Sequence, residues 1–487
     1  MTIPRIALAE DFTISRVLTG LWQIADMERD DRVVDLEAAA AAMAPYVQAG
    51  FTTFDMADHY GSAEVIAGLC RRRLGPGASL QTLTKWVPKP GAITKEDVRE
   101  AVQISLDRLQ VDRLDLLQFH TWYYADPSWL DCLFWLQELK EEGLIHHLGL
   151  TNFDTAHLSV AVHSGVEIVS NQVCFSLLDQ RARGPMTEFC LKHGIKLLAF
   201  GTVAGGFLTE RWLGQPDPGL DSLDTWSQMK YRRYIEVAGG WDRFQELLHT
   251  LDRVARRHGV SMANVATRTI LEQPAVAGVI VGARLGQSEH IADNQRLFEF
   301  SLDETSRAEI EAALSKMTPV PGDCGDEYRK PPFLTASGDL SHHLDSLPAP
   351  FPVQSRGEGR SQVVSGTGWE QMAGYSRAVR SGDRILVSGT TATHRDRAIG
   401  GSDAAAQFHF AVDKIEGAIQ SLGGRLEDVV RTRVYVRRLA DWEAVARAHG
   451  RRFGEIQPAN TLVQADLVGD EYWVEVEAEA VVGSRPS

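Results

Sequence analysis

The sequence predicts a closed barrel of eight parallel strands with helices outside it, followed by a smaller domain of mixed α and β structure. Between residue 15 and about residue 315, short apolar runs alternate with amphipathic stretches, as in a parallel barrel ringed by helices. No G-x-G-x-x-G motif follows the first run, which disfavours a doubly wound dinucleotide-binding sheet. Beyond residue 362 the order of strands and helices changes, which indicates a second domain.

The eight candidate strands are short runs that are apolar almost throughout. Such runs are typical of strands buried on both faces, as the strands of a barrel are. They are residues 16–22, 51–57, 80–86, 114–120, 146–152, 168–173, 195–201 and 276–283.

The stretches between these runs are predicted to be the outer helices. In residues 94–109 apolar side chains recur every three or four positions, and Thr94 stands where an N-cap is expected. Residues 127–143 repeat this pattern, opening on Pro127 and closing on Gly143.

The chain is predicted to divide into residues 1–315, a linker over 316–362, and residues 363–487. The linker holds seven of the nineteen prolines and lacks apolar periodicity. After it, the sequence predicts two strands around a turn at 381–383, helices over 404–423 and 442–454, and strands over 429–436 and 472–483. This region is therefore an α+β domain.

Composition excludes several classes of function for these 487 residues. A hydrophobic content of 44% and a charged content of 24% are those of a soluble globular protein. A net charge of −15 argues against a nucleic-acid surface. No apolar run approaches the roughly 20 residues that span a bilayer, so no membrane contact and a cytoplasmic location are expected. The five cysteines show no metal-ligand spacing, so free thiols and no metal site are expected.

Four polar residues stand at or just after the ends of candidate strands: Asp55, Tyr60, Lys85 and His120. In a barrel of parallel strands these ends open onto the active site, so the four side chains are expected to converge. An ammonium beside a tyrosine favours the phenolate and lowers its pKa, and a carboxylate holds that ammonium in place. With a histidine to hydrogen-bond a substrate oxygen, the set suits protonation of the oxyanion that forms when hydride reaches a carbonyl.

Residues 10 to about 315 resemble the aldo-keto reductases. The resemblance lies in DMADHYGSAE (55–64), KEEGLIHHLGLTNFD (140–154), SNQVCFSLLD (170–179), LLAFGTVAGGFLT (197–209) and GVIVGARLGQSEHIADN (278–294). It implies that Tyr60 is the general acid or base, that Lys85 and Asp55 tune it, and that His120 orients the carbonyl.

The resemblance also implies a site for a nicotinamide dinucleotide. Asn152 and Gln172 would hold the carboxamide, Phe200 would stack on the ring, and small residues after it would cradle the pyrophosphate. The implied cofactor residues are Trp22, Asn152, Gln172, Phe200, Gly201, Thr202, Val203, Gly205, Gly206, Gly282, Arg284 and Asn294. NADPH is favoured over NADH because the guanidinium of Arg284 suits a 2′-phosphate.

Residues 363–483 resemble the RidA family, also called YjgF or UK114, whose fold is chorismate-mutase-like. The resemblance lies in GYSRAVRSGDRILVSG (374–389), LEDVVRTRVYV (426–436), PANT (458–461) and VEVEAEAV (474–481). It implies a trimer with sites between subunits, formed here by Tyr375, Asn460 and Glu475. Asn460 replaces the arginine with which active members bind the carboxylate of a 2-imino acid. Binding of another small molecule, or oligomerisation alone, is therefore favoured over deamination.

The sequence favours an NADPH-dependent reductase of an aldehyde, ketone or imine, fused to a domain that handles a related reactive intermediate. An NAD(P)+-dependent sugar or alcohol dehydrogenase is the alternative within the enzymes. A non-catalytic, cofactor-binding regulatory or scaffold protein is the alternative of another class. Substrate choice is expected to depend on loops after the strands, including residues 122–129 and the long insertion 211–241.

Overall fold

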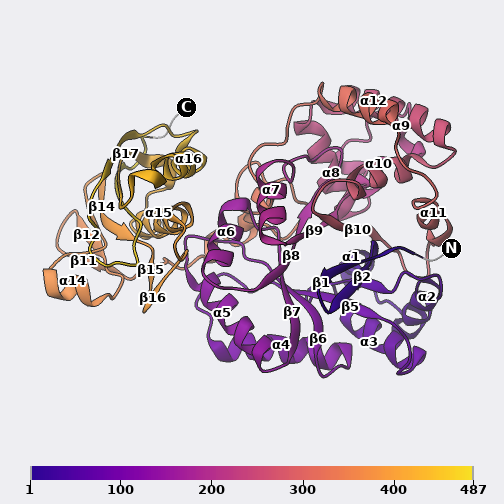
Figure 1. The fold of residues 1–487 in the computed structure, drawn as a ribbon, viewed down its shortest axis with the longest axis horizontal. Helices are drawn as coiled ribbons and strands as arrows, with labels where there is room; N and C mark the ends of the chain where they lie inside the picture. Colours follow the sequence, from indigo (N-terminus) through magenta and orange to yellow (C-terminus); the bar gives the residue numbers. More distant parts are fainter. Residues whose placement is uncertain (1–2, 485–487) are drawn as a thin grey trace.

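The larger part of the protein is a closed barrel (Figure 1). The computed structural model describes residues 3–484. Within them eight parallel strands pair in a ring, whose last strand is hydrogen-bonded to both the first and the seventh. The strands are β3 (Val17–Gly20), β4 (Thr53–Asp55), β5 (Gln81–Trp86), β6 (Leu114–Phe119), β7 (Ile145–Thr151), β8 (Ile168–Cys174), β9 (Lys196–Phe200) and β10 (Val276–Gly282). Each overlaps one predicted run, which confirms the predicted barrel.

An antiparallel hairpin of β1 (Arg5–Ala9) and β2 (Phe12–Ser15) precedes the barrel. Its apolar side chains, including Leu8 and Phe12, are buried with residues of the barrel strands. The hairpin was not among the predicted strands. It packs against β8 and β10 and adds its side chains to the core within the ring.

Helices follow the strands and form the outer layer. They are α1 (Trp22–Met27), α2 (Leu36–Gln48), α3 (Ala63–Leu74), α4 (Lys95–Leu109), α5 (Ser128–Glu141), α6 (Thr155–His163), α7 (Pro185–His193), α8 (Trp226–Val237), α9 (Gly240–His258), α10 (Met262–Leu271), α11 (Ile291–Arg296) and α12 (Glu304–Leu314). Helix α4 begins as predicted: the Thr94 hydroxyl accepts from the Asp97 amide and the Asp97 carboxylate accepts from the Thr94 amide. Helices α8 to α10 all lie between β9 and β10, so the predicted insertion adds a helix to the usual unit.

The segment predicted as a linker takes part in both domains. It contains α13 (Asp326–Arg329), where the buried Arg329 guanidinium donates to the carbonyl oxygens of Thr121 (2.7 Å) and Asn152 (2.6 Å). These carbonyls follow β6 and β7, so this part of the segment lies over the strand ends. Strands β11 (Val353–Ser355) and β12 (Arg360–Val363) begin the second sheet. The boundaries 1–315, 316–362 and 363–487 stay predictions, and residues 1–2 and 485–487 lie outside the described part.

The second domain is a sheet with two helices on one face, drawn orange to yellow in Figure 1. Its strands pair in the order β11-β12-β13-β14-β19-β17-β18. Within the described part of this sheet, β17 and β18 are the only neighbouring strands that run parallel. The remaining elements are α14 (Gly368–Ala373), β13 (Ala378–Ser381), β14 (Arg384–Thr391), β15 (Thr393–His394), β16 (Arg397–Ala398), α15 (Ala404–Ser421), β17 (Val429–Val436), α16 (Trp442–Phe453), β18 (Ala459–Gln464) and β19 (Val474–Val481). The predicted α+β class is confirmed, whereas β11, β12, α14, β15, β16 and β18 were not predicted.

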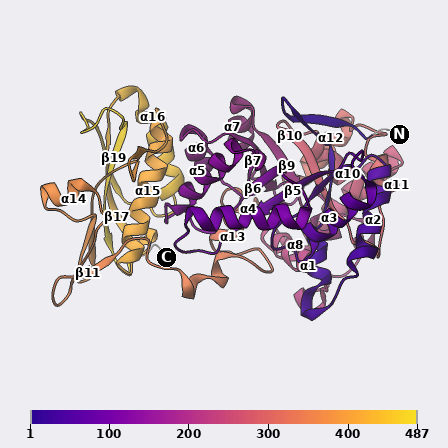
Figure 2. The ribbon, with the colours of Figure 1, turned by 90° about the horizontal axis from the view of Figure 1, so that it is seen from below.

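Helix α15 joins the two domains by packing against α6 of the barrel. Figure 2 shows it between the second sheet and the barrel helices. Ile399 and Phe410 of the second domain belong to the same buried apolar cluster as the barrel helices. A Cβ on Gly417 would lie 2.5 Å from the Ala125 carbonyl oxygen, so the two backbones approach closely there. The domains therefore share a continuous core.

A buried group of charges crosses this contact. His157 of α6 bonds Asp154 through Nδ1 (2.7 Å) and Asp413 of α15 through Nε2 (3.0 Å). Arg452 of α16 pairs with the same Asp413 carboxylate. Burial opposes the charged forms, but these partners raise the pKa of His157 and lower those of Asp154 and Asp413. His157 is held between two carboxylates as a cation.

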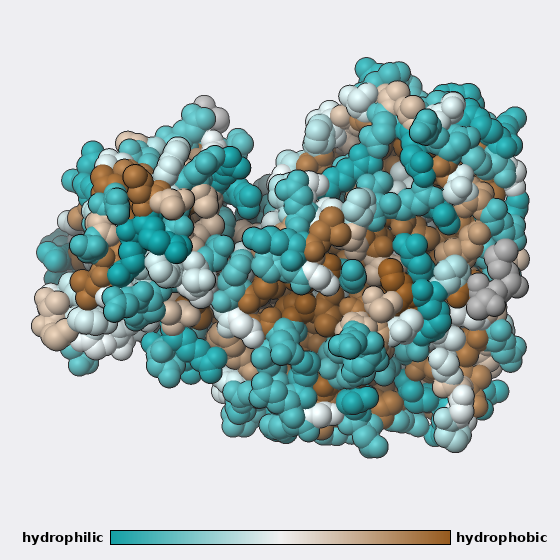
Figure 3. All heavy atoms as spheres, viewed as in Figure 1, coloured by the Kyte–Doolittle hydropathy of each residue, from teal (hydrophilic) through white to brown (hydrophobic). Residues whose placement is uncertain are grey.

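The surface in Figure 3 is mostly hydrophilic, with apolar side chains gathered over the middle of the barrel. A notch separates the two domains at the top of this view. Among the described residues, no helix is long and apolar enough to cross a membrane.

Candidate active site

The structure brings the four predicted catalytic residues together at the carboxyl ends of neighbouring strands. Asp55 ends β4, Lys85 lies near the end of β5, and His120 follows β6 directly. Tyr60 lies in the loop after β4. All four side chains line one cavity of about 1100 Å³. The four side chains therefore lie in one cavity, as their positions at or just after the strand ends predict.

The Lys85 ammonium is fixed by three hydrogen bonds. It donates to both carboxylate oxygens of Asp55 (2.9 and 2.8 Å) and to the Met56 carbonyl oxygen (2.9 Å). Its Nζ lies 4.7 Å from the centre of the Tyr60 ring. Asp55 Oδ1 also accepts from Gln172 Nε2 at 2.7 Å. The lysine is thus anchored beside the tyrosine by a buried carboxylate.

Burial changes the acidity of this group in a direction that the sequence did not predict. Burial raises the pKa of the Tyr60 hydroxyl well above 10.0, and the Asp55 carboxylate raises it further. Burial also lowers the pKa of Lys85, although Asp55 opposes this. The predicted lowering of the tyrosine pKa is therefore wrong here, because burial of the hydroxyl and the nearby Asp55 carboxylate both raise that pKa. Tyr60 is a protonated phenol at neutral pH, the form that can donate to an oxyanion.

His120 is held by a hydrogen bond between its Nδ1 and the Thr151 carbonyl oxygen (3.0 Å). Because a carbonyl only accepts, Nδ1 carries the proton. Burial lowers the pKa of His120 well below 6.5, and the Arg329 charge lowers it further. In the neutral ring Nε2 is then an acceptor. His120 can accept from a hydroxyl as a neutral ring, whereas it donates to a carbonyl oxygen only as an imidazolium.

The same cavity is lined by almost all predicted cofactor residues: Trp22, Asn152, Gln172, Phe200, Gly201, Val203, Gly205, Gly206, Gly282, Arg284 and Asn294. Thr202 is the exception, since it is buried and its hydroxyl lies 3.3 Å from that of Thr267. Its side chain therefore faces the α10 helix, and any contact with a cofactor would involve its backbone.

Two polar atoms in this cavity have no hydrogen-bond partner within the described residues. They are Nε2 of His120 and Oδ1 of Asn152, and both side chains are buried. Buried polar atoms are nearly always paired, so these two are suited to a ligand. Asn152 Oδ1 fits the amino group of a carboxamide, and His120 Nε2 fits a substrate hydroxyl.

The loop after β9 requires small residues because α8 packs against it. A Cβ on Gly201 would lie 2.1 Å from the Tyr231 hydroxyl, and one on Gly205 would lie 2.9 Å from the Ser227 carbonyl oxygen. Both glycines also have positive φ, of 80° and 62°. The glycine loop therefore stays close to α8 while Gly201, Val203, Gly205 and Gly206 line the cavity. The amides of Ala204 and Gly206 donate to the carbonyl oxygens of Gly201 and Val203 within the loop.

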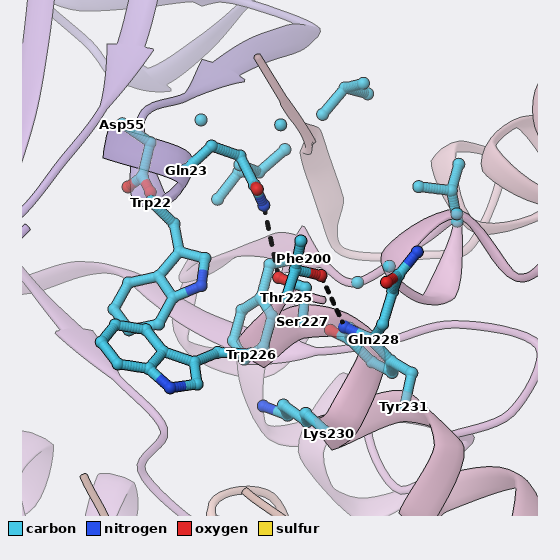
Figure 4. A pocket seen from close by; sticks show the side chains of 18 of the residues that line it. Trp22, Gln23, Asp55, Phe200, Thr225, Trp226, Ser227, Gln228, Lys230 and Tyr231 are labelled. Atoms are coloured by element: carbon cyan, nitrogen blue, oxygen red, sulfur yellow. Dashed lines mark hydrogen bonds between the residues drawn. The ribbon is translucent and has the colours of Figure 1, made fainter. Parts of the chain in front are cut away.

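Sequence reasoning missed the cavity residues that come from α8 and α13, and Gln23 of α1. Figure 4 shows Trp226 of α8 beside Trp22, and Gln23 bonded to Ser227 (3.3 Å). Lys230 of α8 and Tyr328 of α13 also line the cavity. The insertion 211–241 was expected to influence substrate choice, but no spacing in it indicates which side chains turn inward.

Known protein families match both parts of the chain. Residues 16–315 match the model described as the aldo/keto reductase family. The chain belongs to this family. Protein tas of Escherichia coli is 30% identical over 243 residues, which are 45% of this chain and 67% of that protein. The NADH-specific methylglyoxal reductase of Escherichia coli is 25% identical over 331 residues, 63% of this chain and 97% of that protein.

The second domain of this aldo/keto reductase matches another family model. Residues 368–482 match the model described as Endoribonuclease L-PSP. A solved member of the YjgF/YER057c/UK114 family from Mycobacterium tuberculosis is 41% identical, covering 25% of this chain and 99% of its own, with a TM-score of 0.24. The two family models confirm the two resemblances on which the sequence analysis relied.

The three predicted residues of the second domain do not meet within one chain. Asn460 lies on β18 and Glu475 on β19, with β17 between these strands. The Asn460 amide donates to the Thr432 hydroxyl at 2.9 Å. Arg377, which the sequence analysis did not single out, is buried, and its Coulomb attraction to Glu475 lowers the pKa of that carboxyl although burial raises it overall. The guanidinium carbon of Arg377 lies 5.9 Å from the centre of the Tyr375 ring.

Proposed function

We propose that this aldo/keto reductase is an NAD(P)H-dependent reductase of a small aldehyde, ketone or imine. One observation carries the proposal: a protonated Tyr60 lies beside an ammonium that Asp55 holds in place, in the cavity that His120 also lines. Reduction of a carbonyl requires a proton donor and a cation that stabilises the anion left on that donor.

The chain's own residues account for the proton transfer. A bound nicotinamide cofactor would supply the hydride. Tyr60 then gives its proton to the oxygen or nitrogen of the substrate, and the Lys85 ammonium stabilises the phenolate that remains. Asp55 keeps Lys85 at this position. Asn152 Oδ1 would hold the carboxamide of the cofactor, and the Phe200 ring would stack on the face of its nicotinamide; both residues line the cavity.

The reverse reaction is the second candidate, and the His120 tautomer favours it. A neutral His120 presents an acceptor nitrogen to the cavity, which suits the hydroxyl of an alcohol substrate. Oxidation with NAD(P)+ would use the same tyrosine and lysine with the proton moving the other way. The ratio of oxidised to reduced cofactor decides the direction of the reaction.

Turnover with a panel of small aldehydes and ketones tests the proposal. We expect NADPH or NADH to be consumed with some of them, measured by the loss of nicotinamide absorbance, and alcohols to be oxidised by the same protein. Tight binding of cofactor with no turnover of any carbonyl, imine or alcohol would instead support the non-catalytic regulatory or scaffold alternative.

For the cofactor, we propose a preference for NADPH that depends on Arg284. This residue lines the cavity together with His290 and Asn294. Arg284→Ala is expected to raise the Kd of NADPH about 10-fold, because one charge-assisted hydrogen bond to the 2′-phosphate is lost. The Kd of NADH should change little. Fluorescence titration of both cofactors measures this.

Arg256→Ala is the matched control, because Arg256 is exposed on α9 and pairs only with Asp252 among the contacts described. Neither Kd should change in this variant. Equal affinity of the unaltered protein for NADPH and NADH, or tighter binding of NADH, would contradict the preference.

The second domain is proposed to make the protein a trimer and to bind a small molecule between subunits. Helices α15 and α16 cover one face of its sheet, and the barrel covers α15. The other face carries the exposed Leu386 and the ion pair between Arg433 and Glu477 (2.8 Å). This face is free to meet another copy. It would also let Asn460 of one chain approach Glu475 of the next.

Light scattering coupled to gel filtration is expected to give the mass of three chains. A Leu386→Arg variant should shift the protein toward the monomer, because three charges would face one another on the contact. A single-chain mass at every concentration of the unaltered protein would refute the trimer without affecting the reductase proposal.

A further inference from the structure

Lys230 is a cation in the cavity for which the catalytic scheme has no use. It lies on α8 and its side chain is 11% exposed. Its Nζ donates to the Tyr328 hydroxyl at 3.0 Å and lies 4.8 Å from the centres of both the Phe200 and Tyr328 rings. Figure 4 shows Lys230 among the side chains that line the cavity. An ammonium in such surroundings is costly unless something uses its charge.

The neighbouring side chains use only part of the hydrogen-bonding capacity of the Lys230 ammonium. The nearest carboxylate oxygen, Oε1 of Glu327, lies 3.9 Å away, which is too far for a hydrogen bond. The other oxygen of Glu327 accepts from Arg181 at 2.8 Å. Arg181 also pairs with Asp179 (2.7 Å), so two cations balance two carboxylates. This balance of charges keeps Lys230 protonated. Of its three N–H groups, one makes a described hydrogen bond, which goes to the Tyr328 hydroxyl.

Tyr328 connects this cation to the reaction centre. Its ring lies 5.5 Å from that of His120 and 5.9 Å from that of Trp122. The Trp22 ring lies 4.9 Å from that of Tyr60, and the Trp226 ring lies 5.8 Å from that of Trp22. A flat apolar body between these rings would have one end at Tyr60 and His120 and the other toward Lys230.

We propose that Lys230, with the Tyr328 hydroxyl, is a subsite for a carboxylate carried by the carbonyl substrate, separated from the carbonyl by a body about the size of one aromatic ring. The inference rests on the proposed reductase and names its substrate class, an oxo- or formyl-carboxylic acid. The carboxylate accepts from free N–H groups of the ammonium and from the Tyr328 hydroxyl, while the carbonyl oxygen takes the proton of Tyr60. Glu327 stays bound to Arg181.

The subsite explains two features together. It accounts for a cavity-lining lysine whose ammonium lies 4.8 Å from the centres of two aromatic rings, those of Phe200 and Tyr328. It also explains why α13, from a segment with no apolar periodicity, enters the cavity with a tyrosine: the hydroxyl of Tyr328 orients the ammonium. A phenylalanine there would fill the same space but leave Lys230 without its one described hydrogen bond.

A pair of substrates that differ only in charge tests the subsite in the full-length protein. The pair is 4-formylbenzoate and its methyl ester, with the same aldehyde and ring. We expect kcat/KM of the unaltered protein to be higher for the acid. Lys230→Met should lower the acid-to-ester ratio by about 10- to 100-fold, the effect of one charge-assisted hydrogen bond in a buried site. Lys230→Arg should retain part of the preference.

Lys316→Met is the control, because Lys316 is an exposed lysine outside the cavity, 3.6 Å from Glu246. It should leave the acid-to-ester ratio unchanged. Thermal unfolding of each variant separates a loss of folding from a loss of binding, since Lys230→Met also removes a charge near Glu327. A Tyr328→Phe variant should lower the same ratio by less than Lys230→Met does.

The outcomes separate the two proposals. Reduction of both aldehydes with an acid-to-ester ratio that Lys230→Met does not change would overturn the subsite and leave the reductase intact. If the unaltered protein reduces neither aldehyde, the proposed reductase fails for this class. Calorimetric binding of the acid and the ester in the presence of NADP+ then decides the subsite alone, and equal Kd values for the two compounds would overturn it.

Discussion

Replacing Tyr60 with phenylalanine is expected to lower kcat for carbonyl reduction by about 100- to 10,000-fold, the contribution of a positioned general acid. The variant keeps the ring that contacts Trp22 and Lys85 and removes only the hydroxyl. Because the pKa of Tyr60 is raised, the phenol is protonated over the whole neutral range and its loss cannot be offset by pH. Steady-state consumption of NADPH with a good aldehyde substrate measures the change.

Cofactor binding should survive this substitution, since Asn152, Phe200 and the glycine loop are untouched. Tyr472→Phe is a matched control, because it removes a hydroxyl that accepts from Thr393 in the second domain. It should leave kcat unchanged. Full reductase activity in Tyr60→Phe would show that another group supplies the proton, and the role given to the tyrosine would be withdrawn.

Replacing Asp413 with alanine is expected to lower the free energy of unfolding by about 3–5 kcal/mol, the usual effect of removing one partner of a buried ion pair. Asp413 is the carboxylate shared by His157 of the barrel and Arg452 of the second domain. Its loss leaves Arg452 with Glu416 and His157 with Asp154. Urea denaturation measures the change. Glu443→Ala, which breaks an exposed pair with Arg447, should cost less than about 1 kcal/mol.

The same cluster makes the stability of the contact between the domains depend on pH. The pKa of Asp413 is lowered from 3.8, so its contribution to stability is present above 3.8 and is lost as the pH falls through the folded value. The pKa of His157 is raised from 6.5, so its contribution is complete below 6.5 and is lost as the pH rises through the folded value. An Asp413→Ala protein whose stability and pH profile match those of the unaltered chain would contradict this role.

The barrel and its four central side chains could be predicted because they depend on local sequence and on topology. A buried parallel strand reads as an apolar run, and the geometry of a barrel brings the ends of such runs together. Asp55 and Lys85 needed no further information. The pKa of Tyr60 was predicted in the wrong direction because it depends on how deeply three side chains are buried together, which no spacing in the sequence reports.

The rest of the cavity could not be predicted, because its residues come from segments outside the repeating unit. Lys230 lies in an insertion whose helix has charged and aromatic residues on several sides, and Tyr328 lies in a proline-rich segment without periodicity. Thr202 stands within a recognisable loop, yet it turns toward Thr267. In each case a long-range contact sets the direction of the side chain.

The short loop after β6 makes each domain part of the other's environment. It begins at His120, and three residues later Tyr123 donates a hydrogen bond to Gln420 of α15. The carbonyl of Ala125 then meets the backbone at Gly417. A barrel expressed without residues 316–487 would lose this support for the loop, the Tyr328 wall and the helix that covers α6. The two domains therefore cannot be exchanged independently: replacing the second domain with that of a relative would also change the surroundings of the barrel's active site.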